Sequence, residues 1–79
     1  MSIFVKSGES GKIETWSLPS GDLSVSGPVA GALEQIMFEL CGSSGVRSTP
    51  GHGKKGWIVP AREKATVLAG LECRCTKIL

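Results

Sequence analysis

The segment Gly45–Pro60 reads Gly-Val-Arg-Ser-Thr-Pro-Gly-His-Gly-Lys-Lys-Gly-Trp-Ile-Val-Pro, and it organises the predicted fold. Two short β-prone runs, residues 46–49 and 57–59, flank a loop of Pro, Gly, His and Lys. Glycine permits unusual backbone angles, and Pro50 fixes the start of the turn. The segment therefore predicts a β-hairpin.

Positive charge gathers on this predicted hairpin. Arg47 lies on its first strand, and its loop carries His52 and two lysines. Trp57 lies between β-formers and is expected to pack in the core. Two further basic residues follow at the start of the next predicted helix, so we expect one basic patch. The candidate partner-binding residues are Arg47, His52, Lys54, Lys55, Trp57, Arg62 and Lys64.

The two halves of the chain differ in charge. Residues 1–45 hold two basic and five acidic side chains, a net charge of −3, whereas residues 46–79 hold seven and two, a net charge of +5. Such an asymmetry can mark a face for nucleic acid or for an acidic partner. The alternative is that both halves fold together and their charges interleave on one surface.

Three strands are predicted before the first helix. Residues 3–7 and 12–17 are rich in β-formers, and a Gly-Glu-Ser-Gly turn joins them into a hairpin. Alternation along the second strand predicts that Trp16 and Leu18 face the core. A Pro-Ser-Gly-Asp turn then leads to a third strand at residues 23–26, which completes a meander.

The first helix is predicted between Pro28 and Gly42. Proline is favoured in a first helical turn, and Ser26 or Gly27 is placed to cap it. A glycine at position 42 is typical of a helix end. One buried stripe at helical spacing consists of Val29, Leu33, Ile36, Met37 and Leu40.

A second helix is predicted from Pro60 to about Ala69, because Gly70 follows. Residues 71–75 then alternate between apolar and polar side chains, which predicts a closing strand with its two cysteines on one face. The buried side of the second helix is predicted to contain Ala61, Ala65 and Leu68, with Val67 near its edge.

The predicted element order is β-β-β-α-β-β-α-β, an α+β fold in which a small antiparallel sheet is backed by two helices. Residues 1–79 are expected to form one domain, and a chain of this size buries only about 60% of its unfolded surface. The two Phe and two Trp residues are expected to supply much of the core volume. A full catalytic cleft is hard to build at this size, whereas a binding face is easy.

No residue pattern points to catalysis, a metal or a cofactor. His52 lies between glycines with no orienting group near it in sequence, so it lacks the setting of a general base. The loop departs from a P-loop because Lys55 replaces the hydroxyl residue, yet its amides and lysines suit one phosphate of a nucleic acid. The possible zinc ligands Cys41, Cys73, Cys75 and His52 have unusual spacing, so the cysteines are expected to be buried thiols.

The cysteine count and the first residues bear on location. Three cysteines, an odd number, favour free thiols in a reducing compartment. Residues 1–20 lack the pattern of a signal peptide, and no apolar stretch approaches the roughly 20 residues that span a bilayer. We therefore expect a cytoplasmic protein that has no membrane partner.

Residues 29–71 contain a helix, Gly-Val-Arg-Ser, a polar turn, Lys-Gly-Trp-Ile-Val-Pro and a helix ending in Leu-Ala-Gly-Leu. This outline resembles the hairpin-and-helix pattern of HARP-type DNA-annealing modules, in which a Lys-x-Trp-x-aromatic-Pro strand follows a basic turn. Val59 stands where that pattern has the aromatic residue. The resemblance implies contact with branched or distorted DNA through Arg47, Lys54 and Lys55.

As a small single-domain α+β chain, the protein is also similar as a class to phage-encoded anti-CRISPR proteins, which act by stoichiometric binding. Many of those inhibitors are acidic mimics of DNA, whereas this chain has a net charge of +2. We therefore expect a non-enzymatic inhibitor that docks on a protein or ribonucleoprotein complex handling nucleic acid and blocks target engagement in the host cytoplasm. The alternative is a small DNA- or RNA-binding module that contacts phosphates through residues 46–64.

Overall fold

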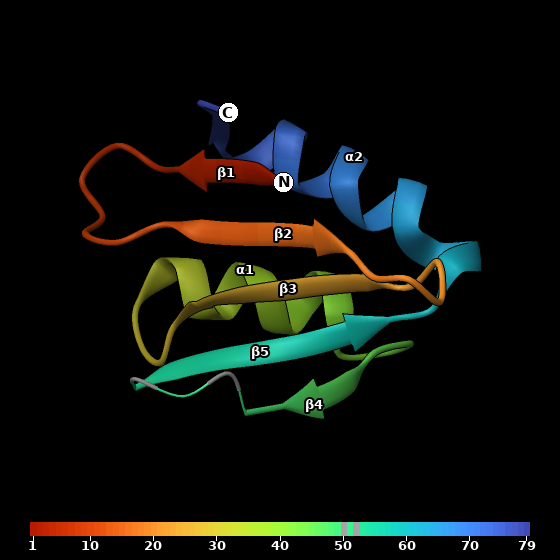
Figure 1. Ribbon diagram of the computed structural model, residues 1–79. Coiled ribbons are helices and arrows are strands. Elements are labelled where there is room, and N and C mark those ends of the chain that lie inside the picture. The colour runs from red at the N-terminus through yellow and green to blue at the C-terminus, as the bar shows by residue number, and fades with distance from the viewer. Residues whose placement is uncertain (50, 52) are drawn as a thin grey trace.

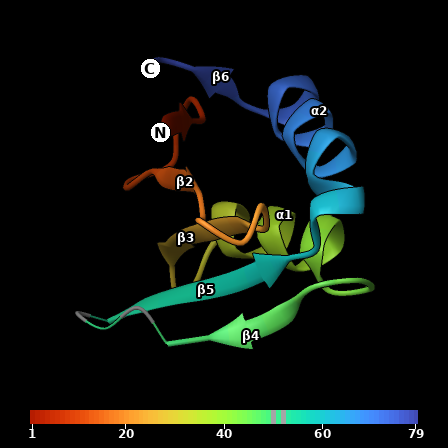
Figure 2. The same cartoon turned by 45° about the vertical axis from the view of Figure 1, so that its right-hand side comes forward.

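An antiparallel sheet curls around two helices in the computed structural model, which describes residues 1–49, 51 and 53–79. Within those residues the sheet has six strands in the order β4-β5-β3-β2-β1-β6, and the α+β prediction is confirmed (Figures 1 and 2). The strands are β1 Ser2–Val5, β2 Ile13–Ser17, β3 Leu23–Pro28, β4 Val46–Ser48, β5 Lys54–Val59 and β6 Thr76–Lys77. The helices are α1 Ala32–Cys41 and α2 Lys64–Arg74, the latter preceded by a short 3-10 turn at Ala61–Glu63.

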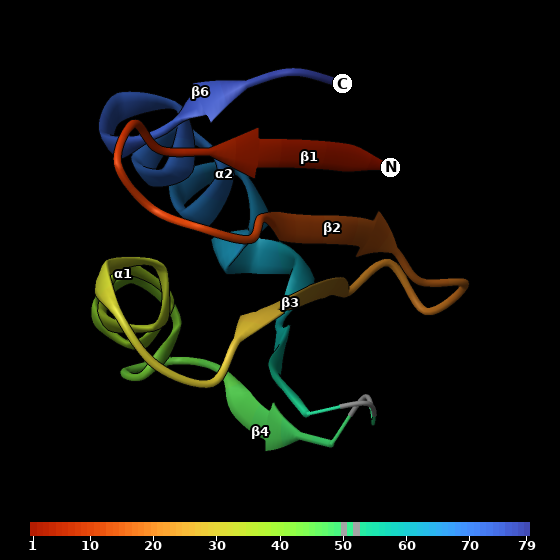
Figure 3. The same ribbon diagram turned by 90° about the vertical axis from the view of Figure 1, so that its left-hand side faces the viewer.

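Both helices lie on the concave side of the sheet, which leaves the convex side uncovered by helix (Figures 2 and 3). Strand register decides which side chains face each way, because successive residues alternate. The pairs Leu23↔Val59 and Val25↔Trp57 face the helices, and all four residues are buried. We call this side the helix face and the opposite side the outer face.

The outer face carries a row of side chains from four strands. Trp16 pairs with Ser24, Ser24 with Ile58, and Ile58 with Val46, so the four share one face. Trp16 is 41% exposed and Val46 is 69% exposed. The prediction that Trp16 faces the core is therefore wrong.

The buried residues of β2 are Ile13 and Thr15, which lie on the helix face. Alternation predicts that one side of a strand is buried, but the choice of side depends on pairing with β3. Leu18 lies outside the strand and is half-buried. Bulk alone favours burial of Trp16 and Leu18, whereas the fold buries the smaller residues of the other face.

Helix α1 begins at Ala32, four residues later than the predicted start at Pro28, which instead ends β3 opposite Lys54. Gly31 adopts a φ of 91°, and the backbone N–H of Ala32 donates to Glu9 Oε1 at 3.0 Å. A carboxylate from the β1–β2 turn thus accepts a hydrogen bond from an N–H that has no partner within the helix. Its negative charge is also stabilised by the positive end of the helix dipole. The predicted caps Ser26 and Gly27 belong to β3 instead.

Helix α2 continues through Gly70 to Arg74, so the predicted end near Ala69 is wrong. A Cβ placed on Gly70 would lie 2.5 Å from Leu40 Cδ2. The glycine therefore allows α1 and α2 to approach closely, rather than ending the helix. The closing strand shrinks to Thr76–Lys77 as a consequence.

The hydrophobic core fills the space between the helices and the helix face of the sheet. The predicted buried side of α2 is wrong in part. Ala61 precedes α2 and is exposed, Ala65 is also exposed, and the buried residues are Leu71 and Val67, the second of which was predicted near the edge. Val29 of the predicted α1 stripe is 49% exposed. The core comprises Phe4, Ile13, Leu23, Val25, Leu33, Ile36, Met37, Cys41, Trp57, Val59, Val67 and Leu71. Among the described residues, neither helix is long and apolar enough to cross a membrane.

Candidate partner-binding surface

The predicted basic hairpin forms from β4 and β5. Its register pairs Val46 with Ile58, Arg47 with Trp57, and Ser48 with Gly56. β5 pairs on its other side with the central strand β3, so the hairpin is an extension of the sheet. The predicted site residue His52 lies outside the described residues.

Trp57 joins the hairpin to the core. Its side chain is 5% exposed, which confirms the prediction that it packs in the core. The ring of Phe38 on α1 lies 6.2 Å from the Trp57 ring at an interplanar angle of 53°. Arg47 Cζ lies 5.4 Å from the same ring, in the range of a cation–π contact. We call Phe38, Arg47 and Trp57 the tryptophan cluster.

Phe38 is the member of this cluster that is not among the predicted binding residues. It is 56% exposed, although aromatic side chains were expected to fill the core. Its position falls outside the predicted buried stripe of α1, and that spacing was the signal for an outward-facing aromatic side chain.

A hollow of about 340 Å³ lies beside the tryptophan cluster, and we call it the hairpin hollow. Its lining residues are basic or carry hydroxyl groups. They are Arg47, Ser48, Thr49, Lys54 and Lys55. Side chains of these types bind anions through charge and hydrogen bonds, but the surface that they present here is mainly carbon, because both lysine ammonium groups are paired with carboxylates.

The two lysines of the hairpin are held by carboxylates on opposite faces of the sheet. Lys54 Nζ lies 3.0 Å from Glu14 Oε1 on the outer face, and Lys55 Nζ lies 2.8 Å from Glu34 Oε1 of α1. The side chains of Glu14 and Glu34 are only 14% and 21% exposed. Neither carboxylate was predicted to matter, because each becomes a lysine partner only through the fold.

A third ion pair joins Arg74 of α2 to Glu39 of α1. The hydrogen bond from Arg74 is the main cause that lowers the pKa of Glu39, and a hydrogen bond from Gln35 adds to it. All three ion pairs thus connect the acidic first half of the chain to its basic second half. At these positions the charges interleave, which was the second of the two alternatives drawn from the charge asymmetry.

The predicted basic patch divides into two groups. Arg62 and Lys64 follow the C-terminal end of β5, whereas Lys54 and Lys55 begin it. A strand of this length spans roughly 17 Å. Lys64 Nζ is turned toward β2, where it donates to Ser17 Oγ at 2.6 Å. The structure therefore groups Arg47, Lys54 and Lys55, and places Arg62 and Lys64 elsewhere.

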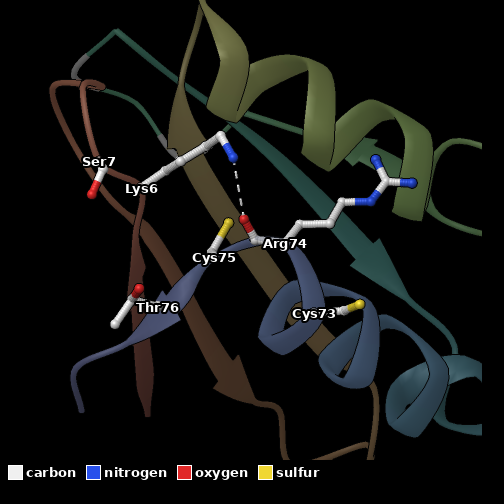
Figure 4. A pocket seen from close by; sticks show the side chains of 6 residues that line it. All are labelled: Lys6, Ser7, Cys73, Arg74, Cys75 and Thr76. Atoms are coloured by element: carbon white, nitrogen blue, oxygen red, sulfur yellow. Dashed lines mark hydrogen bonds between the residues drawn. The ribbon is translucent and has the colours of Figure 1, made fainter.

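A second hollow, of about 310 Å³, lies where the end of α2 meets β1 (Figure 4). Lys6 Nζ donates to the Arg74 carbonyl oxygen at 3.4 Å beside the thiol of Cys75. Burial raises the pKa of Cys75, and the charges of Lys6 and Arg74 partly oppose that shift. The hollow is lined by Lys6, Ser7, Cys73, Arg74, Cys75 and Thr76.

The three cysteines occupy different environments, and all are free thiols. The predicted shared strand for Cys73 and Cys75 is wrong, because Cys73 lies on α2 and its sulfur points away from Cys75 (Figure 4). Only Cys41 is fully buried, whereas Cys73 is exposed. The described residues contain no group of three His, Cys, Asp or Glu side chains that could hold a metal ion.

These environments predict an order of alkylation. Burial raises the pKa of Cys41 to about 11, so its thiol stays protonated near neutral pH and reacts through its thiolate only when pH approaches that value. In a brief iodoacetamide pulse at about pH 8, we expect Cys73 to be modified first and Cys41 only after unfolding in urea. Peptide mass spectrometry measures each site, and early labelling of Cys41 in the native protein would contradict the structure.

Comparison of the chain with protein-family models, with curated proteins and with solved structures found no match. Functional inference therefore depends on the residues themselves, above all on the tryptophan cluster and the hairpin hollow.

Proposed function

We propose that this chain is a non-enzymatic binding protein that docks on a protein or ribonucleoprotein complex handling nucleic acid and blocks target engagement. The tryptophan cluster is the observation that carries the proposal. Aromatic residues and Arg are enriched at the centres of protein interfaces, where a few anchors supply most of the affinity. Phe38 and Arg47 are exposed while the buried Trp57 supports both, so the anchors are held in place before binding.

The hairpin hollow lies next to these anchors and adds positive charge at the edge of the surface. Charges at such a position steer approach and set specificity, while the central anchors set the lifetime of the complex. Direct nucleic-acid binding as the whole function is the second candidate, and the hollow favours it. The ion pairs of Lys54 and Lys55 weigh against it, because both charges are already partnered.

Affinity capture with the tagged chain tests this proposal. The bait is compared with a Phe38→Ala/Arg47→Ala variant and with Trp16→Ala, which changes an aromatic side chain on the outer face. We expect a captured complex that survives nuclease treatment and is lost with the double variant alone. The purified complex should then lose target binding at about one equivalent of the chain. A complex that keeps its target binding, or a capture that nuclease abolishes, would overturn the proposal.

A further inference from the structure

We infer that the hairpin hollow binds phosphate groups of the nucleic acid in that complex, and that Glu14 and Glu34 act as internal anions that the phosphates must displace. The inference rests on the proposed function, because it assigns a ligand to the same hairpin. It adds a chemical class of ligand, and it proposes that the two carboxylates limit the affinity for free nucleic acid by competing with the phosphates.

The types of residue around the hollow suit a phosphate, although the lining is mainly carbon while the lysines are paired. Arg47 and two lysines surround it together with Ser48 and Thr49. Cationic and hydroxyl side chains make most protein contacts to nucleic-acid phosphates. Arg47 is already held over the Trp57 ring, 5.4 Å from its centroid, so little side-chain freedom is lost when its guanidinium meets a ligand.

The two lysines line the hollow with their stems while their ammonium groups are held elsewhere. Neighbouring residues on a strand point to opposite faces, so Lys54 reaches Glu14 on the outer face and Lys55 reaches Glu34 on the helix face. A lysine side chain is a flexible four-carbon stem that ends in a compact charge. Release from its carboxylate therefore frees each ammonium group to turn toward an anion in the hollow.

Competition between carboxylates and phosphates sets the affinity. The side chains of Lys54 and Lys55 are 44% and 35% exposed, so their ion pairs are partly solvated and weak enough to exchange. Displacement leaves Glu14 and Glu34 unpaired although both are largely buried. Isolated oligonucleotides should consequently bind weakly, whereas a strand presented within a docked complex offsets this cost through the other contacts.

Conservative glutamine variants test the inference. Glu14→Gln and Glu34→Gln keep the side-chain shape and remove the competing charge, while Glu39→Gln does the same to the Arg74 pair away from the hollow. A labelled single-stranded oligonucleotide is titrated with each variant, and its anisotropy is measured at about 50 and 200 mM salt. We expect Glu14→Gln and Glu34→Gln each to tighten binding by about two- to fivefold, the range of a partly exposed ion pair, and Glu39→Gln to leave it unchanged.

Lysine variants are expected to change oligonucleotide affinity in the opposite direction. Lys54→Gln and Lys55→Gln should weaken binding, and each should reduce the salt slope by about one when measured in the Glu14→Gln/Glu34→Gln background. A polyglutamate peptide of equal charge is the matched competitor and should displace the oligonucleotide poorly. Equal competition by polyglutamate would show a general anion site and overturn the phosphate assignment. Absence of tightening in both glutamate variants, with far-UV circular dichroism showing native folding, would also overturn it.

The two proposals fail separately. Nuclease-resistant capture that depends on Phe38 and Arg47, combined with no response to the glutamate variants, leaves the docking function standing and removes the phosphate site. Tighter oligonucleotide binding by the glutamate variants, combined with no captured complex, leaves the phosphate chemistry and removes the docking function.

Discussion

Replacement of Phe4 by alanine is expected to lower the free energy of unfolding by about 3–5 kcal/mol. Phe4 is 0% exposed on β1 and packs in the core between the sheet and the helices. Its loss removes transfer free energy and leaves a cavity that the strand backbone cannot close. A domain of this length has a stability of roughly 4–12 kcal/mol, so the variant is expected to be close to unfolding at room temperature.

Phe38→Ala is the matched control, since it deletes the same atoms from a side chain that is 56% exposed. We expect this substitution to lower the free energy of unfolding by less than about 1 kcal/mol, and this loss comes from the contact with Trp57. Urea denaturation followed by far-UV circular dichroism measures both variants. Equal destabilisation by the two substitutions would mean that α1 is rotated and that the candidate contact surface is part of the core.

This pair of residues shows how far sequence reasoning reached. The strands, the hairpins and the stripe of α1 were predictable, because turn glycines and apolar spacing are local signals. The stripe leaves Phe38 outside the core, whereas no local signal places Phe4 inside it. Only tertiary packing decides that Phe4 lies against the helices, because either face of a strand can be the buried one.

The ends of the helices were also predicted wrongly, because they too depend on tertiary contacts. The start of α1 is fixed by Glu9, which is 23 residues before Ala32 in the sequence. The 3-10 turn before α2 has a similar long-range acceptor, because the Ala61 N–H donates to Asp22 Oδ1 at 3.1 Å. Gly70 looks like a stop signal, yet it serves contact with Leu40. Local rules for caps and stops cannot include partners that the fold brings from elsewhere.

The candidate site was predictable in part. Its basic hairpin and Trp57 followed from composition and turn chemistry in one segment. The carboxylates that hold the lysines did not, because Glu14 and Glu34 lie 40 and 21 residues away from them. The net charge of the segment therefore overestimates the unpaired positive charge of the hairpin. The tryptophan cluster is consequently the stronger candidate for partner contact.

Substitution of Trp57 by alanine should cost about 3–5 kcal/mol of unfolding free energy, whereas Trp16→Ala should cost less than about 1.5 kcal/mol. Both deletions remove an indole ring from the sheet, but Trp57 is 5% exposed on the helix face and Trp16 is 41% exposed on the outer face. Chemical denaturation of the two variants, followed by far-UV circular dichroism, compares them directly. A larger effect at Trp16 would require a one-residue shift of strand register, since such a shift exchanges the two faces of a strand.

Variants of Trp57 and Arg47 together distinguish a residue that supports the surface from one that contacts the partner. Removing the ring takes away the support of Arg47 and Phe38, so a loss of partner capture in Trp57→Ala would not identify which group touches the partner. Trp57→Phe keeps an aromatic ring in the core and should recover most of the stability, because part of the buried apolar volume is retained. If capture returns with stability in Trp57→Phe but remains lost in Arg47→Ala, then Arg47 is the contacting group and Trp57 positions it. Capture that stays lost in a stable Trp57→Phe protein would instead place the indole itself at the interface.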